Sequence, residues 1–261
     1  MHMKYLLPFL LFNWCLLLSA NAQISYETEK DSLLYIFQNN DDLLPLDKLD
    51  RIVFRTAYGI NPIGFGDMLN RFTHVPEISK DSISFIKSCR PNDVHIVSFM
   101  APENDSIASM ALRNFLQSLQ KLHNEKVIAI VFGIKKYYNA DHIMSLPFSN
   151  CTSVLYCNDT SAYAQQEAAQ LIMGARKNSP PNTISPGIKY ILGVQQIEQK
   201  EIETNGRLRY ANASSVGLNE EVFTNIDSIA LNGITEGAFP GCQVLVSIKC
   251  KIVYQKSFGH H

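Results

Sequence analysis

The sequence has almost no excess of charge of either sign. Its 261 residues include 23 Lys and Arg against 24 Asp and Glu, a formal net charge of −1. No run of like charges forms a basic arm or an acidic tail. Because nucleic-acid binding needs a clustered positive patch that neutralises phosphates, we expect no nucleic-acid partner.

Long apolar runs are also scarce, and the clearest one is at the N-terminus. The stretch Leu6 to Leu18 follows a single lysine and precedes the small residues Ala20-Asn21-Ala22. This pattern predicts a signal peptide over residues 1–22 and an exported protein, periplasmic or secreted. A buried or anchoring helix is the alternative, although the run is short for about 30 Å of hydrocarbon. No later stretch is long enough to cross a membrane, so no stable span is expected after cleavage.

Cysteine patterns typical of metal sites are missing. There is no C-x-x-C pair, and no histidine stands at metal-ligand spacing from a cysteine, so a structural zinc is not expected. We also expect no other metal and no cofactor. An odd number of cysteines follows the predicted cleavage site, which leaves at least one unpaired within the chain. Cys151 and Cys157 flank a predicted strand that holds them too far apart to bridge. We interpret all five as small buried hydrophobic residues: Cys89, Cys151, Cys157, Cys242 and Cys250.

What the sequence does contain is an alternation of apolar strand-like runs and helical stretches. The strand-like runs are apolar throughout, which indicates strands buried on both faces and a parallel sheet with helices on each side. Residues 23–188 are therefore predicted to form an α/β domain, a three-layer sandwich with a mainly parallel sheet. Residues 31–38 fit either a helix or a strand. The other predicted strands are 51–57, 94–100, 127–132 and 152–157, and the predicted helices are 62–72, 79–88, 103–123, 141–146 and 160–174.

The composition changes after Asn178. Two Pro-rich stretches that cannot continue a helix come first, and the polar residues 189–217 are predicted to be an extended linker. Residues 218–261 then predict a helix, 219–231, and a β-hairpin whose turn is Lys249-Cys250. A helix and two strands cannot bury a core alone, so this unit is incomplete or packs on something else.

A credible set of catalytic residues is missing as well. Ser84 to Lys87 and Ser118 to Lys121 both fit S-x-x-K, but they lie on predicted helices without the context that motif requires. Glu103 and Asp159 stand at predicted strand ends, where acids are typical of helix caps and dipole partners. We predict no catalytic residue and no metal ligand, and the binding residues stay open.

Three motifs between residues 35 and 175 carry a family resemblance. They are Leu43-Leu44-Pro45-Leu46, the strand end Val131-Phe132-Gly133, and Asp159-Thr160 followed by Gln165-Gln166-Glu167-Ala168-Ala169. In this order they resemble the C-terminal α/β sandwich domain of family 3 glycoside hydrolases, especially the bacterial β-N-acetylglucosaminidase-like branch. The resemblance implies a carbohydrate or peptidoglycan-derived ligand.

This chain departs from that family in two places. After Val-Phe-Gly the family usually continues with Asn-Pro, whereas Ile134-Lys135 follows here. That loop is at a strand's carboxyl end, where α/β sheets place ligand groups. In the family the nucleophile is an aspartate on a preceding TIM barrel, for which this sequence offers no counterpart. A retaining glycosidase needs two carboxyl groups about 5 Å apart, and no such pair can be named.

A second resemblance covers residues 209–261. The segments 237–246, Lys251-Ile252-Val253-Tyr254 and Phe258-Gly259 resemble the start of class C β-lactamase-like and penicillin-binding-protein-like serine hydrolases. There the nucleophile is the serine of an S-x-x-K that follows the first hairpin, which would place it beyond His261. The two resemblances imply a fragment of an exported bacterial fusion hydrolase, inactive as given, whose parent acts on cell-wall or other glycan-related substrates. The alternative is a non-catalytic carbohydrate-binding or scaffolding module.

Overall fold

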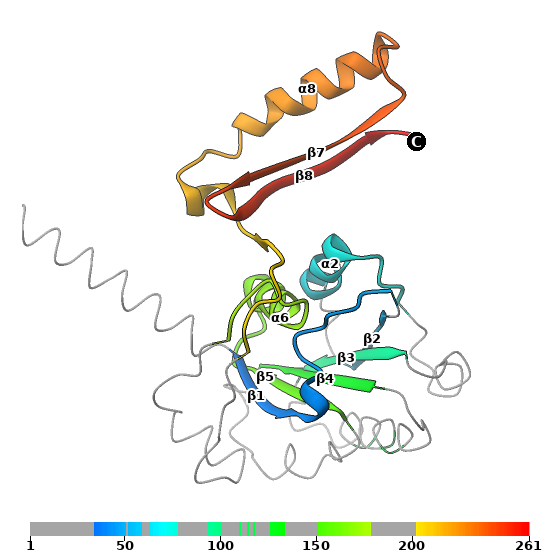
Figure 1. Ribbon diagram of the computed structural model, residues 1–261, viewed down its shortest axis with the longest axis vertical. Helices are drawn as coiled ribbons and strands as arrows, with labels where there is room; N and C mark the ends of the chain where they lie inside the picture. Colours follow the sequence, from blue (N-terminus) through cyan, green and yellow to red (C-terminus); the bar gives the residue numbers. More distant parts are fainter. Residues whose placement is uncertain are drawn as a thin grey trace, which may run out of the picture.

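The computed structural model contains two sheets, one in each half of the chain (Figure 1). It describes residues 34–50, 52–58, 63–77, 93–100, 126–133, 151–178 and 202–260, together with Met110, Asn114 and Gln117. The predicted signal peptide and the predicted helices 79–88 and 141–146 lie outside the described residues.

The larger sheet has five strands in the order β1-β5-β4-β3-β2. Strands β2 to β5 are parallel neighbours, and β1 runs antiparallel to β5. This confirms the predicted mainly parallel sheet, and the ambiguous stretch 31–38 contains a strand. A short 3-10 turn, η1 (Asn40–Asp42), follows β1. The strands are β1 (Leu34–Asn39), β2 (Ile52–Tyr58), β3 (Val94–Met100), β4 (Lys126–Phe132) and β5 (Ser153–Cys157).

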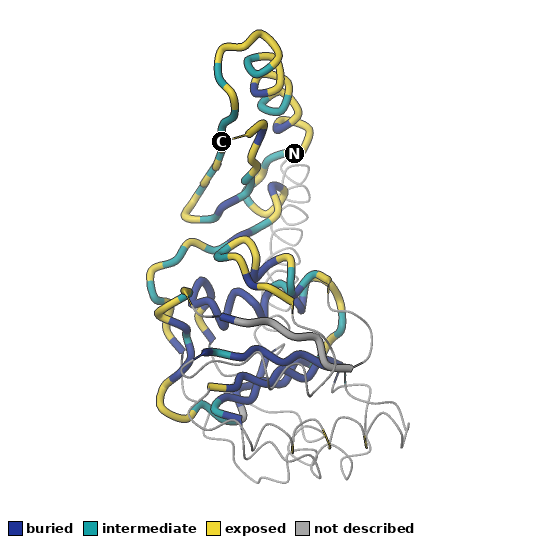
Figure 2. The backbone as a smooth tube through the Cα atoms, turned by 90° about the vertical axis from the view of Figure 1, so that its right-hand side faces the viewer, coloured by how far each residue is buried: buried dark blue, intermediate teal, exposed yellow. Residues whose placement is uncertain are grey.

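Both faces of this sheet are covered. Consecutive buried residues fill β5, all of β4 after its first residue, and all of β3 between its two end residues. A strand covered on only one face would alternate buried and exposed residues. Figure 2 shows these strands as almost unbroken dark tubes. The burial pattern therefore confirms the predicted three-layer sandwich.

Two described helices, α2 (Ile63–Phe72) and α6 (Ala162–Ile172), lie side by side over one face of the sheet (Figure 1). They approach closely because Gly64 has no side chain, since a Cβ there would lie 3.3 Å from a carbonyl oxygen of α6. The ring of Phe65 packs edge-on against Phe132 of β4, with centroids 5.6 Å apart. This contact anchors the helix layer to the middle of the sheet.

Three described positions fall in the predicted helix 103–123, and all three are helical. Met110 is 60% exposed, although an apolar residue of a packed helix would be expected to face the core. Asn114 and Gln117 are exposed too, and a spacing of four and then three residues places all three on one helical face. That face is turned to solvent.

The C-terminal unit is a helix on a small sheet. The predicted helix and hairpin are confirmed, with the helix shifted a few residues along the chain. Lys249 and Cys250 form the turn with φ of 52° and 61°, the left-handed pair that suits a two-residue hairpin loop. The elements are β6 (Arg209–Tyr210), η5 (Ala213–Val216), α8 (Val222–Thr235), β7 (Gly241–Ile248) and β8 (Lys251–Gly259), and the sheet order is β6-β8-β7.

The cysteines divide into two kinds. Cys151 and Cys157 are buried free thiols, as predicted, and burial raises the pKa of each to about 12. Cys250 is exposed at the hairpin turn and Cys242 is partly exposed, so the prediction of buried residues is wrong for Cys250. The turn forces this outcome, because a two-residue loop leaves no neighbour to cover its side chains. Cys89 lies outside the described residues.

Candidate functional site

The carboxyl edge of the larger sheet brings together two of the motifs singled out in the sequence. The backbone N–H of Gly133, just after β4, donates a hydrogen bond of 2.9 Å to the carbonyl of Cys157 at the end of β5. Asp159 and Thr160 follow directly and lead into α6. In a mainly parallel sheet this edge is where ligands bind. It is therefore the first candidate for a ligand-facing surface.

A tyrosine that the sequence did not indicate joins this edge. Because β1 is antiparallel, its first residues lie beside the end of β5, with Leu34 opposite Cys157. The amide of Asn158 donates a hydrogen bond of 3.3 Å to the hydroxyl of Tyr35. Burial raises the pKa of Tyr35, and the bond from Asn158 only partly offsets this effect, so the hydroxyl stays protonated. Only knowledge of the direction of β1 could have placed Tyr35 here.

Asp159 is already engaged in its own turn. One carboxylate oxygen accepts hydrogen bonds from the backbone N–H groups of Thr160, at 2.6 Å, and Ser161, at 3.2 Å. The other accepts the Ser161 hydroxyl at 2.8 Å. Ser161 is the N-cap of α6, and its hydroxyl oxygen accepts the N–H of Ala164. The acid thus stands before the cap, where its charge complements the helix dipole.

The other residues considered in the sequence lie outside the described residues. They are Glu103, Ser84, Lys87, Ser118, Lys121, Ile134 and Lys135.

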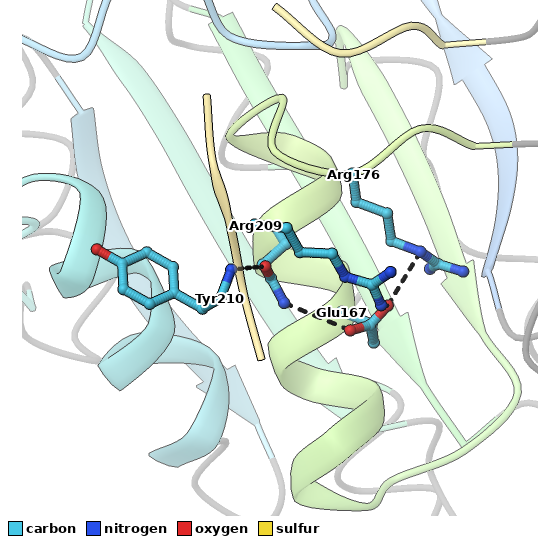
Figure 3. A network of polar contacts seen from close by, with 5 residues as sticks. Glu167, Arg176, Arg209 and Tyr210 are labelled. Atoms are coloured by element: carbon cyan, nitrogen blue, oxygen red, sulfur yellow. Dashed lines mark hydrogen bonds and ion pairs between the residues drawn. The ribbon is translucent and has the colours of Figure 1, made fainter. Parts of the chain in front are cut away.

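The most elaborate polar constellation surrounds Glu167, in the middle of α6 (Figure 3). This residue is only 2% exposed. One of its carboxylate oxygens contacts Nε of Arg176 at 3.0 Å and Nη2 of Arg209 at 2.5 Å. The amide nitrogen of Gln170 donates to the other oxygen at 3.4 Å, and the Gln170 oxygen accepts the backbone N–H of Tyr210 at 2.7 Å. Burial alone would lower the pKa of Arg209, but the hydrogen bond and charge of Glu167 outweigh it and raise that pKa.

These contacts hold the Glu167 carboxyl group in a fixed position. Two guanidinium groups neutralise Glu167, and Arg groups do not give up protons in proteins. No nucleophile or second carboxylate is hydrogen-bonded to Glu167 in the contacts of the described residues. In the sequence, Glu167 stood out only as part of a motif. Its pairing with Arg209 could not be predicted, because 42 residues separate the two. The geometry favours an anchoring role over a catalytic one.

A second cluster ties α8 to the hairpin. Asp227 of α8 accepts the hydroxyl of Tyr254 and, at 2.8 Å, the ammonium of Lys256. The hydrogen bonds from Lys256 and Tyr254 lower the pKa of Asp227. Burial and the bond to Asp227 raise the pKa of Tyr254 to about 12, so its phenolate is not a nucleophile near neutral pH. The ring of Phe223 stacks on Tyr254 at 4.8 Å, which completes a helix-to-sheet contact.

Among the residues that the structure describes, no three His, Cys, Asp or Glu side chains are grouped in a way that could hold a metal ion. No described helix combines the length and the apolar character needed to cross a bilayer.

Comparison with known proteins gives structural likenesses only. No family model and no curated protein matches the chain. A β-glucosidase from Listeria innocua in complex with isofagomine is 16% identical with a TM-score of 0.41, over 56% of this chain and 24% of that one. A fungal multi-domain family 3 β-N-acetylglucosaminidase is 13% identical with a TM-score of 0.44, over 89% and 29%. A family 3 β-N-acetylglucosaminidase from Paenibacillus is 10% identical with a TM-score of 0.40, over 57% and 29%. The chain thus spans less than a third of each of these proteins.

Proposed function

We propose that the chain is a module of an exported hydrolase related to family 3 glycoside hydrolases, and that it faces glycan without cleaving it. The observation that supports this most is the meeting of two family-like motifs at one sheet edge. Val131-Phe132-Gly133 and Asp159-Thr160 lie far apart in sequence but end neighbouring strands, β4 and β5. Asn158, held by a hydrogen bond to the buried hydroxyl of Tyr35, adds a polar group there that suits sugar hydroxyls.

The expected lack of cleavage rests on the hydrogen bonds that Asp159, the acid at this edge, already makes. Glycoside hydrolysis by the usual route needs two carboxyl groups with different roles. Asp159 has both oxygens occupied by backbone and hydroxyl donors of its own turn. A carboxyl group whose oxygens are both held in this way is fixed in its own turn and is not positioned to protonate a glycosidic oxygen. The described residues at this edge offer no second carboxylate.

The C-terminal unit is, in this proposal, the opening of a serine-hydrolase domain. Its support is the sequence resemblance over 209–261 together with the order helix, strand, turn, strand. The specific alternative is a scaffolding module that binds no sugar. It is favoured by the apolar side chains that α8 leaves uncovered, among them Ile229 at 72% exposure.

A binding and turnover experiment tests the proposal. The chain from Gln23 to His261 is purified and titrated by calorimetry with N-acetylglucosamine oligosaccharides and with a muropeptide. A chromogenic N-acetylglucosaminide and nitrocefin are then assayed against a heat-killed control. We expect glycan binding and no turnover of either substrate. Turnover would overturn the non-catalytic assignment, and the absence of any glycan binding would overturn the glycan-facing role and leave the scaffold.

A pair of tyrosine variants locates the binding. Y35F removes the buried hydroxyl that holds the Asn158 amide at the carboxyl edge, and Y254F removes a hydroxyl from the α8–hairpin contact. We expect Y35F to weaken glycan binding several-fold, roughly the loss of one hydrogen bond, and Y254F to leave it unchanged. Equal effects would place the sugar elsewhere.

Export is tested separately. Residues 1–30 are fused to alkaline phosphatase, which is active only after export from a bacterial cytoplasm. Activity with a mature N-terminus at Gln23 is the expected result. A cytoplasmic, uncleaved fusion would overturn the signal-peptide prediction.

A further inference from the structure

The segment 202–210, which we name the strap, connects the two halves of the described structure. The sequence predicts a polar, extended linker over 189–217. The strap is extended, but its residues are hydrogen-bonded to the sandwich along much of its length. It begins with Ile202, which is 3% exposed and whose carbonyl accepts the N–H of Asn178 at 3.0 Å.

The first half of the strap fastens the loop after β1 to the end of α6. The guanidinium of Arg207 donates to the carbonyls of Leu46, Asp47 at 2.6 Å, and Met173 at 2.7 Å. Met173 is the C-cap of α6, where carbonyl groups have no partner within the helix. The amide of Asn205 adds a bond of 2.9 Å to Leu46. A cation placed at this helix end also complements the dipole.

The second half of the strap is fixed to the middle of the helix layer. Arg209 pairs with buried Glu167, and the backbone of Tyr210 bonds to α6 through Gln170. The ring of Tyr210 packs edge-on against Phe72 of α2 at 5.1 Å, and its hydroxyl donates to the carbonyl of Arg71 at 2.9 Å. Tyr210 is thus held by both helices. Figure 3 shows the strap crossing beside α6 with Arg209 reaching Glu167.

The same residues are bound to the C-terminal hairpin. Arg209 and Tyr210 form β6, which pairs parallel with β8 opposite Lys251 and Ile252. The hydroxyl of Tyr210 also contacts the side-chain amide of Gln255. Ile252 is 7% exposed and belongs to the same buried cluster as the sandwich core. One tyrosine therefore bridges α2, α6 and β8.

We propose that the strap is an interdomain joint that locks the C-terminal helix and hairpin onto the α2–α6 layer in one orientation. Its strength comes from a buried partner, because Glu167 is 2% exposed and Arg209 supplies one of the two guanidinium groups that neutralise it. The joint does not depend on the proposed function, because it holds whichever ligand the sheet edge binds. It makes the C-terminal unit a fixed extension of the sandwich.

A distance measurement between spin labels tests the lock. One label is placed on the exposed native Cys250 at the hairpin turn, and the other on α2 after D67C, in a chain with C89S and C242S. Cys151 and Cys157 are buried, with pKa values of about 12, and take no label. We expect one narrow distance distribution by double electron–electron resonance.

Three substitutions then distinguish a loosened joint from a general loss of stability. R209Q and Y210F each remove a contact of the joint, and Q255A removes one on the hairpin side without touching the sandwich core. We expect each to broaden the distribution, and R209Q to lower Tm by about 6–12 °C. The control K177Q breaks the exposed pair between Lys177 and Glu203 of the strap, whose side chains are 44% and 68% exposed, and should change neither readout.

Two results would overturn the joint. The first is a broad distribution in the unmodified chain. The second is a distribution that stays narrow in both Y210F and Q255A while Tm shows that the variants are folded.

Discussion

The strands of the two sheets of this molecule are buried to very different extents. In β4 every residue after Lys126 is buried, whereas in β7 partly buried residues alternate with exposed ones. The helix α8 leaves Ile229 72% and Leu231 53% exposed, and Figure 2 shows the contrast between the dark sandwich and the pale C-terminal unit. A sheet covered on two faces builds a core, and a hairpin with one helix does not. The strap joins the C-terminal unit to the sandwich core through the pairing of β6 with β8.

The largest expected difference between the two regions is the effect of truncating an apolar side chain. F65A removes a ring that is fully buried against Phe132, and should lower the free energy of unfolding by about 3–5 kcal/mol. The matched change L245A, at a β7 position that is 50% exposed, should cost less than about 0.5 kcal/mol. Urea unfolding measures both. Similar losses at the two positions would mean that the hairpin is as well packed as the sandwich.

A slightly smaller effect on the free energy of unfolding is expected from Glu167, the buried acid that pairs with Arg209 of the strap. E167Q leaves Arg176 and Arg209 facing a neutral amide in a buried site, which should cost about 3 kcal/mol in the same assay. E203Q removes the exposed partner of Lys177 and should cost less than about 1 kcal/mol. If the two substitutions cost the same, the Glu167 network contributes nothing beyond a surface pair.

Substitutions at two glycines distinguish the cost of a left-handed backbone from the cost of a clash with the strap. Gly174 and Gly217 have φ of 73° and 87°, but only at Gly174 would a Cβ collide with Asn205, at 2.4 Å from its side chain. G217A should cost about 1–2 kcal/mol for the left-handed backbone alone. G174A should cost at least about 1 kcal/mol more, because the strap must move. Equal costs in urea unfolding would mean that Asn205 does not press on the end of α6.

The smallest effect concerns the thiols. Cys250 should be alkylated rapidly at pH 8, and Cys151 and Cys157 only after unfolding, as read by mass spectrometry of labelled peptides. Their folded pKa of about 12 lies above the ordinary thiol value of 9.0, so the unfolded chain releases these protons first. Their contribution to stability is therefore complete below about pH 9 and lost as the pH rises towards 12. Fast labelling of Cys157 in the native chain would contradict its burial.

Much of the sandwich could be predicted because its strands are apolar without interruption, as in Val127 to Phe132. Such runs need cover on both faces, which fixes the layer arrangement. The strap could not be predicted in the same way. Its polar side chains match those of a solvated linker, and the bonds of Arg207 reach Leu46 and Asp47 about 160 residues away. The placement of Tyr35 depended on the antiparallel direction of β1, which no local pattern encodes.

Hydrogen exchange in the presence of a glycan tests the central claim most directly. Peptides of the full chain are followed by mass spectrometry with and without an N-acetylglucosamine oligosaccharide, and released sugar is measured in the same samples. We predict slower exchange at the carboxyl edge, in peptides covering Val154 to Tyr163, unchanged exchange from Gly241 to Phe258, and no released sugar. Protection confined to the hairpin, or sugar released faster than in a heat-killed control, would contradict it.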